Sequence, residues 1–108
     1  MGKAQRRKGH DWEREVAASL QRLDPSARRL LEYQEGAGID IKTTLPMAVQ
    51  CKCGRSLAVA LSGLKEAQAV AAPGIIPVCA YHADRKGSFA VLAWDDFVDI
   101  FGVYMRKV

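Results

Sequence analysis

The stretch from Gly38 to Cys53 reads GIDIKTTLPMAVQCKC, the pattern of two short strands joined by a tight turn at Leu45-Pro46. Side chains two residues apart on a strand point to the same face and lie roughly 6.5–7 Å apart. Gln50 and Lys52 therefore share one face of the second strand. If the two strands pair as a hairpin, Asp40 on the first strand joins them.

The segments on either side of this hairpin alternate between helical and strand patterns. A helix that separates two strands of one sheet requires a parallel crossover. The sequence thus predicts a layered α/β domain with a mixed sheet flanked by helices. We expect helices at about residues 10–23, 62–72 and from 95 onward, and strands at about 28–34, 39–44, 47–53, 75–81 and 88–93.

Apolar side chains recur at helical spacing in the first and last of these helices. We interpret both stripes as core-facing surfaces rather than platforms for stacking nucleic-acid bases. The residues are Trp12, Val16, Leu20 and Leu23 in the first helix, and Trp94, Phe97, Phe101 and Tyr104 around the last.

Composition restricts the class of protein. A chain of 108 residues with 49% hydrophobic and 26% charged residues is typical of one globular domain. No apolar run approaches the ~20 residues that cross a bilayer, so we expect no membrane span. The net charge is +4, and basic residues crowd into positions 3–8. We expect a basic arm at residues 1–9 that binds a polyanion, or that is simply a solvated tail, before a single domain at residues 10–108.

The three cysteines favour reduced thiols in a cytoplasmic protein, because their number is odd and no export signal precedes them. Strand alternation sends Cys51 and Cys53 to the face opposite Gln50 and Lys52, where we expect them to lie in the core. Cys79 does not complete the paired spacing of common zinc sites, so no zinc is expected.

The predicted element order, with Asp40 on the second strand and Gln50-x-Lys52 on the third, resembles the PD-(D/E)XK nuclease superfamily. In addition, residues 8–15 (KGHDWERE) are similar to the opening of the first helix in archaeal-type Holliday junction resolvases and small phage nucleases. The resemblance covers roughly residues 7–81. It implies a restriction-endonuclease-like αβββαβ core, here extended by an extra strand and a C-terminal helix.

The resemblance also assigns roles to residues. It places a metal-site glutamate at Glu13, an acid at Asp40 and the motif lysine at Lys52, with Gln50 where the family usually has a second acid. It implies Mg²⁺ or Mn²⁺ held by Asp40, Gln50, Glu13 and the backbone carbonyl of Cys51. In that arrangement Lys52 lowers the pKa of the attacking water and stabilises charge on the phosphate.

DNA is the partner that the resemblance implies. The resolvase arginine that contacts phosphate falls on Arg14, whereas Arg28 and Arg29 lack the spacing of the resolvases' first-strand arginine from Asp40. Concerted cleavage of two strands would require a homodimer, and such nucleases are common in bacteria and bacteriophages. The expected DNA-binding residues are Lys3, Arg6, Arg7, Lys8 and Arg14.

Three functional hypotheses follow. The first is a divalent-metal-dependent endodeoxyribonuclease acting on branched or structured DNA, as in DNA recombination. The second is a nuclease-fold DNA-binding protein that Gln50 has left weakly active or inactive. The third is an unrelated α/β interaction module. For Asp40 and Lys52, the alternative to a site is an ordinary cross-strand ion pair. Gln68 lies either near the site, as the resemblance to some members of the superfamily implies, or on a polar helix surface.

Overall fold

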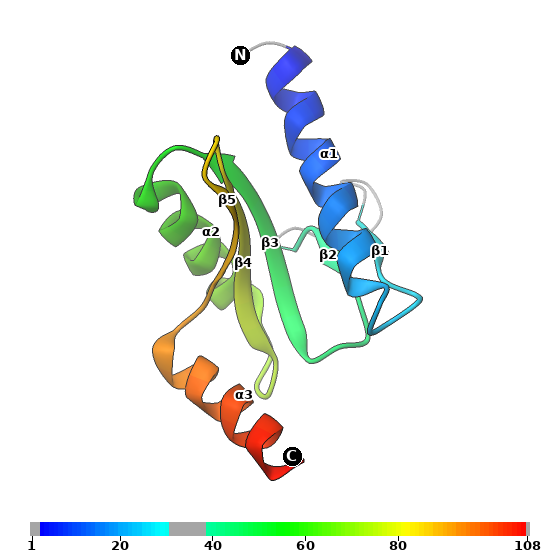
Figure 1. Cartoon of the computed structure of the whole chain (residues 1–108), viewed down its shortest axis with the longest axis vertical. Coiled ribbons are helices and arrows are strands. Elements are labelled where there is room, and N and C mark those ends of the chain that lie inside the picture. Colours follow the sequence, from blue (N-terminus) through cyan, green and yellow to red (C-terminus); the bar gives the residue numbers. More distant parts are fainter. Residues whose placement is uncertain (1–2, 31–38, 108) are drawn as a thin grey trace.

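The computed structural model describes residues 3–30 and 39–107, with side chains from Arg7 onward in the first range. Within these ranges the chain forms three helices and five strands (Figure 1). In chain order they are α1 (Lys3–Leu20), β1 (Arg28–Arg29), β2 (Ile41–Lys42), β3 (Met47–Gly54), α2 (Leu57–Val70), β4 (Ile76–Ala83), β5 (Gly87–Val91) and α3 (Trp94–Arg106).

The strands form one mixed sheet in the order β1-β2-β3-β4-β5. β3 and β4 run parallel, and the other neighbouring pairs run antiparallel. Helix α2 makes the crossover between the parallel strands, as the sequence predicts. Helices α1 and α2 cover opposite faces of the sheet (Figure 1). The prediction of a layered α/β domain with a mixed sheet is therefore confirmed.

Each helix buries its own apolar cluster against the sheet, so both faces of β3 are covered. Alternate residues of β3 consequently face different helices. The cluster under α1 contains Val16, Ala17, Ile41 and Val49. The cluster under α2 contains Ala60, Leu64, Cys79, Tyr81 and Ala83.

A buried carboxylate ties the loop after α1 to the turn between β2 and β3. Asp24 accepts hydrogen bonds from Ser26 (Oγ, 2.7 Å; N, 3.0 Å), from Thr43 Oγ1 (2.7 Å) and from Thr44 N (2.7 Å). These bonds, led by the Ser26 hydroxyl, hold the pKa of Asp24 well below its usual range. The hairpin that carries Asp40 is thereby held at a set position relative to α1.

The first helix is displaced from the predicted range of 10–23. It begins at Lys3, because the Lys, Ala, Gln and Arg residues of the expected arm are strong helix formers. It ends at Leu20, so Leu23 follows in a turn and is 73% exposed. The prediction that Leu23 belongs to the core stripe is therefore wrong, whereas Val16 is buried and Trp12 packs beside it.

Other boundaries differ less. β3, β4 and β5 lie within two residues of their predicted ends, and α2 begins at Leu57 rather than at Ser62. The predicted strands 28–34 and 39–44 correspond to the two-residue strands β1 and β2 in the described ranges. Residues 31–34 of the first of them lie outside the described residues.

Helix α3 contradicts the prediction of a core-facing stripe. None of its residues is buried, and Phe97, Phe101 and Tyr104 are 41%, 49% and 59% exposed. The helix leaves the edge strand β5 and extends beyond the sheet (Figure 1), so neither α1 nor α2 covers it.

Candidate functional site

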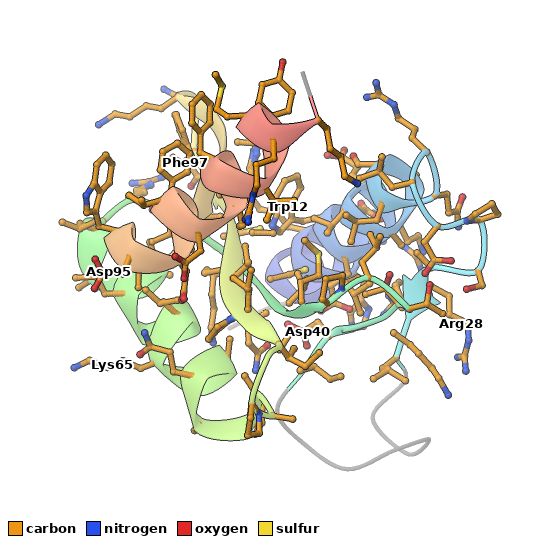
Figure 2. All side chains as sticks on the ribbon, turned by 90° about the horizontal axis from the view of Figure 1, so that it is seen from below. Trp12, Arg28, Asp40, Lys65, Asp95 and Phe97 are labelled. Atoms are coloured by element: carbon orange, nitrogen blue, oxygen red, sulfur yellow. The ribbon has the colours of Figure 1, made fainter. Side chains whose placement is uncertain are left out.

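Asp40 lies immediately before β2, where that strand meets β3. Its backbone N–H donates to the Val49 carbonyl (2.9 Å), and its carbonyl accepts from Leu30 N (2.9 Å). Its side-chain Oδ2 accepts a 2.7 Å hydrogen bond from the backbone N–H of Cys51. Because strand N–H groups lie in the plane of the sheet, this bond draws the carboxylate into that plane, between α1 and α2 (Figure 2).

The surroundings of Asp40 disfavour its charge. Burial raises the pKa of the Asp40 carboxyl, and the Cys51 N–H opposes this shift. The charges of Glu13 and Glu66 raise the pKa further, while that of Lys52 lowers it. A half-buried carboxylate with two acids and one base nearby is a place where an added cation would be favourable.

Gln50 and Lys52 share the face of β3 that α2 covers, as the hairpin pattern predicts. Gln50 is buried and pairs in register with Cys79, a member of the cluster under α2. Lys52 Nζ forms a 2.8 Å ion pair with Glu66 Oε2 on α2. Lys52 therefore pairs with Glu66 and does not form the simple cross-strand ion pair with Asp40 that was the alternative to a functional site.

Glu66 is a residue that the sequence interpretation missed. It lies three residues after Gly63, which places it beside the buried side of α2 and above Lys52. The polar residue considered on this helix, Gln68, is exposed. In the sequence, only the spacing of Glu66 from the small residues of α2 indicates that it lies beside the sheet.

Glu13 approaches Asp40 from the opposite side of the sheet. Its Oε1 accepts from Arg29 Nε (3.1 Å), and both side chains are about four-fifths buried. Arg29 pairs in register with Ile41, which packs under α1. Glu13 therefore lies on the α1 side of the sheet and Lys52 on the α2 side. Asp40 lies in the plane of the sheet, and both charges affect its pKa.

The donors predicted to hold a metal come from both sides of the sheet, because Glu13 lies on the α1 side and Gln50 on the α2 side. Asp40, Glu13, the Gln50 amide oxygen and the Cys51 carbonyl are hard ligands of the kind Mg²⁺ accepts. However, Arg29 already neutralises Glu13, and Cys51 N–H engages one oxygen of Asp40. In residues 3–30 and 39–107, no group of three or more His, Cys, Asp or Glu side chains has a metal-binding arrangement.

Cys51 and Cys53 lie on the face of β3 opposite Gln50 and Lys52, as strand alternation predicts, but the prediction that both lie in the core is not confirmed, because each is only partly buried. Cys51 packs against the cluster under α1, Cys79 is buried under α2, and Cys53 is half-buried. Burial raises the pKa of all three thiols, that of Cys79 to about 11. At neutral pH the protonated form predominates, and this form is a poor ligand and nucleophile.

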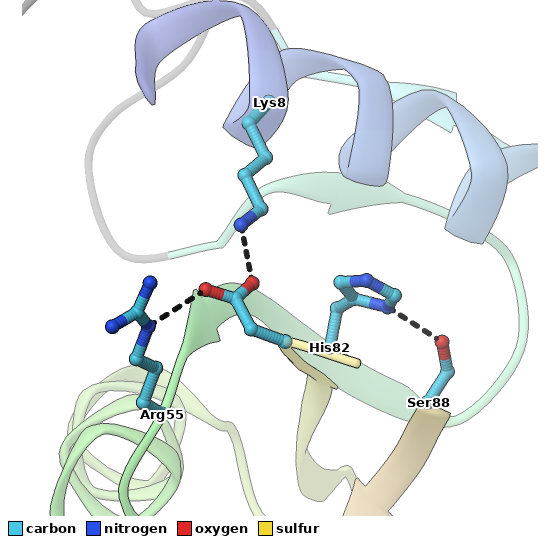
Figure 3. A network of polar contacts seen from close by, with 5 residues as sticks. Lys8, Arg55, His82 and Ser88 are labelled. Carbon is cyan, nitrogen blue, oxygen red and sulfur yellow. Dashed lines mark hydrogen bonds and ion pairs between the residues drawn. The ribbon is translucent and has the colours of Figure 1, made fainter. Parts of the chain in front are cut away.

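The residues of the basic N-terminal segment meet different surroundings. Lys3 and Arg6 belong to α1, but their side chains lie outside the described part. Arg7 is exposed, and the exposed Arg14 pairs with Asp11 on its own helix (Nη1–Oδ1, 2.8 Å). Lys8 forms an ion pair with Asp84 at the turn between β4 and β5 (Figure 3).

Asp84, in the turn between β4 and β5, organises a second cluster of charges. It accepts from Lys8 and from Arg55 Nε (3.4 Å), and these contacts, led by Lys8, lower its pKa (Figure 3). An open pocket of about 640 Å³ adjoins this network. Its lining includes Lys8, Arg55, His82, Asp84, Arg85 and Lys86.

This basic pocket, with four cations around one carboxylate, lies near the predicted site. Arg55 follows Lys52 by three residues, which corresponds to roughly 10 Å along an extended chain. His82 forms the other wall, where its Nδ1 lies 3.0 Å from Ser88 Oγ and its ring contacts Trp12 (centroids 5.4 Å apart). The pocket therefore lies beyond the end of β3 and toward α1, whereas Lys52 faces α2.

Comparison of the chain with protein-family models, curated proteins and solved structures found no match. In the described residues, no helix is both long enough and apolar enough to cross a membrane.

Proposed function

We propose that this chain is a divalent-metal-dependent endodeoxyribonuclease with a PD-(D/E)XK-type core. The observation that carries the proposal is the half-buried Asp40 at the junction of β2 and β3, with acids on both sides and Lys52 nearby. The order α1-β1-β2-β3-α2-β4 supports it, because the acid precedes the second strand and Gln50-x-Lys52 lies on the third.

Each residue has a distinct role in this proposal. Asp40 and the Gln50 amide oxygen would hold Mg²⁺ or Mn²⁺, which would supply a water of lowered pKa and neutralise phosphate charge. Glu66 holds the Lys52 ammonium in place until a phosphate oxygen accepts its hydrogen bond instead. Glu13 and its partner Arg29 set the charge on the α1 side of Asp40.

DNA is the proposed substrate. The basic pocket supports this choice, because its cations attract a polyanion. The cations of the pocket, which lie on α1, just after β3 and in the turn between β4 and β5, are suited to the phosphates of a nucleic acid. Branched or structured DNA, and action by a homodimer, follow from the resemblance to Holliday junction resolvases.

Asp40→Asn tests the proposal directly. Purified protein is incubated with Mg²⁺ or Mn²⁺ and labelled four-way junction, nicked duplex or single-stranded DNA. We expect cleavage of at least one substrate, and a loss of roughly 100-fold or more in Asp40→Asn, because a metal contributes several kcal/mol to such reactions. Glu15→Gln removes an exposed acid of α1 and serves as the control. Absence of cleavage in every case, with Asp40→Asn equal to wild type, would contradict the proposal.

A second candidate function is DNA binding without hydrolysis. The neutral Gln50 and the Glu13–Arg29 ion pair both reduce the negative charge available to a metal, which favours this alternative. Gln50→Glu separates the two functions in the same assay. An inert wild type that becomes a nuclease on this change identifies the binding protein, whereas an active wild type identifies the enzyme.

A further inference from the structure

Helix α3 exposes an apolar surface that the rest of the described chain leaves uncovered. Trp94, Phe97, Phe101 and Tyr104 follow a 3-4-3 spacing, which places them on one side of the helix. Their rings form a continuous series with successive centroids 5.4, 5.9 and 5.7 Å apart. We call this row of four rings the aromatic ladder.

The exposed apolar area is too large to be an incidental feature. The ladder residues are 41–73% exposed, so at ~200 Å² for a complete ring they offer on the order of 400 Å². Val98 and Met105 flank the ladder and are about half exposed. Such a patch is typical of an interaction surface. The ladder alone supplies about half of the ~800 Å² per partner that a specific interface buries.

The charges at the two ends of α3 favour a second copy of the same helix as the partner of the ladder. Asp95, Asp96 and Asp99 lie in its first half, and Arg106 and Lys107 lie at its end. A second α3 running antiparallel sets the acidic start of each helix level with the basic end of the other. It also aligns opposite ends of the two helix dipoles. A parallel copy would instead set acids against acids.

The spacing along α3 is compatible with a two-fold axis. Asp95 and Lys107 are each six residues from Phe101, so a two-fold axis at Phe101 sets the acidic start of each helix level with the basic end of its partner. The same register sets Phe97 opposite Met105 of the other copy. A single set of contacts, used twice, then buries both ladders.

We propose that two copies of this chain associate through their α3 aromatic ladders, packed antiparallel about Phe101. The occupant of the surface is thus a second copy, whose own α3 carries both the apolar face and the reversed charges that the first requires. This argument uses only the geometry of α3, so it stands whether or not the chain cleaves DNA.

The test measures the mass of the full chain by sedimentation velocity and light scattering over a range of protein concentration. Wild type is expected to be a dimer. Phe101→Glu is expected to weaken association by roughly tenfold or more, because it sets two charges at the centre of the interface. Leu57→Glu, the same kind of change at an exposed position on α2, is the control. Since no residue of α3 is buried, the melting temperature of the monomer should be little changed.

Charge reversal tests the antiparallel arrangement itself. Variant one carries Asp95→Lys and Asp96→Lys, and variant two carries Arg106→Asp and Lys107→Asp. Each alone is expected to dimerise more weakly than wild type, and an equimolar mixture is expected to form the heterodimer. The chain with all four changes is expected to dimerise like wild type.

Three results would overturn the proposal. The first is a wild type that is monomeric at every concentration. This result would mean that the ladder binds a different protein or another segment of polypeptide. The second is a dimer that Phe101→Glu does not weaken. The third is a mixture of the two charge variants that associates no better than either alone.

Discussion

The carboxylate of Asp40 is unfavourable to bury in its charged form, and it is also the group proposed to bind the metal. Its backbone is held on two sides, and Cys51 N–H orients its carboxylate, so the side chain cannot turn into solvent. Burial and the acids Glu13 and Glu66 then raise its pKa. Groups whose pKa is raised in such surroundings, here in spite of the opposing charge of Lys52, are typical of functional sites.

The raised pKa of Asp40 predicts a particular dependence of stability on pH. Between the unfolded pKa near 3.9 and the higher folded pKa, the folded state binds more protons, so the free energy of unfolding falls as pH rises through this window. At pH 7–8 without metal, we expect Asp40→Asn to melt a few degrees above wild type, and at about pH 4 the difference should vanish.

Thermal melts in EDTA across this pH range measure the effect. Glu15→Gln, at an exposed position, is the control and should leave the difference from wild type independent of pH. An Asp40→Asn protein that melts below wild type at neutral pH would show that the carboxylate is stabilising rather than strained. Added Mn²⁺ should raise the melting temperature of wild type only, since Asp40→Asn lacks the anionic ligand.

Among the elements, α2 determines where Lys52 lies. Gly63 lets the helix approach β3 so closely that a Cβ at this position would lie 2.5 Å from Cys79 Sγ and 2.7 Å from Lys52 Cγ. This close approach also sets Glu66 above Lys52. The glycine is therefore required by packing, even though glycine disfavours a helix interior.

Gly63→Ala is expected to destabilise the chain despite its better helix propensity. Overpacking costs about 1–3 kcal/mol and exceeds the ~1 kcal/mol gained by replacing a helical glycine. Chemical denaturation measures the change, and Gly9→Ala on α1, where no atom lies within 4 Å of the added Cβ, should instead be neutral or stabilising. Adding Cys79→Ala removes the closest atom and should recover part of the loss. An equal response of Gly63→Ala and Gly9→Ala would contradict this account.

In the whole molecule, charged and apolar surfaces lie at different ends. The basic pocket lies where the first half of α1 meets the turn between β4 and β5, while α3 extends from the other end of β5 (Figure 1). The proposed polyanion and the proposed second copy therefore occupy separate surfaces.

The basic pocket predicts a local effect on DNA affinity. Lys86→Glu in the pocket is expected to weaken DNA binding and to reduce the slope of log affinity against log salt by about 1, because one phosphate contact is lost. Arg22→Glu makes the same change in charge near the far end of α1 and is the control. Salt titrations monitored by fluorescence anisotropy measure both. Equal effects of the two variants would show that only the overall charge of the chain matters.

Much of the fold could be predicted because it depends on local pattern. Alternation along β3 correctly separates Gln50 and Lys52 from Cys51 and Cys53, and the helix between β3 and β4 correctly indicates a parallel pair. The sequence pattern predicts too short an α1. The polar first half of this helix has no apolar stripe, so only its helix propensity indicates that it is helical.

What the sequence by itself determined is the order of the elements and the faces of β3, since both follow from the period of the backbone and the placement of apolar side chains. Only the tertiary structure decided which distant charges meet, as in Lys52 with Glu66, Glu13 with Arg29 and Lys8 with Asp84. It also decided that the aromatic ladder is exposed. A hydrophobic pattern shows that a helix has an apolar face, but what lies against that face depends on where the fold places the helix.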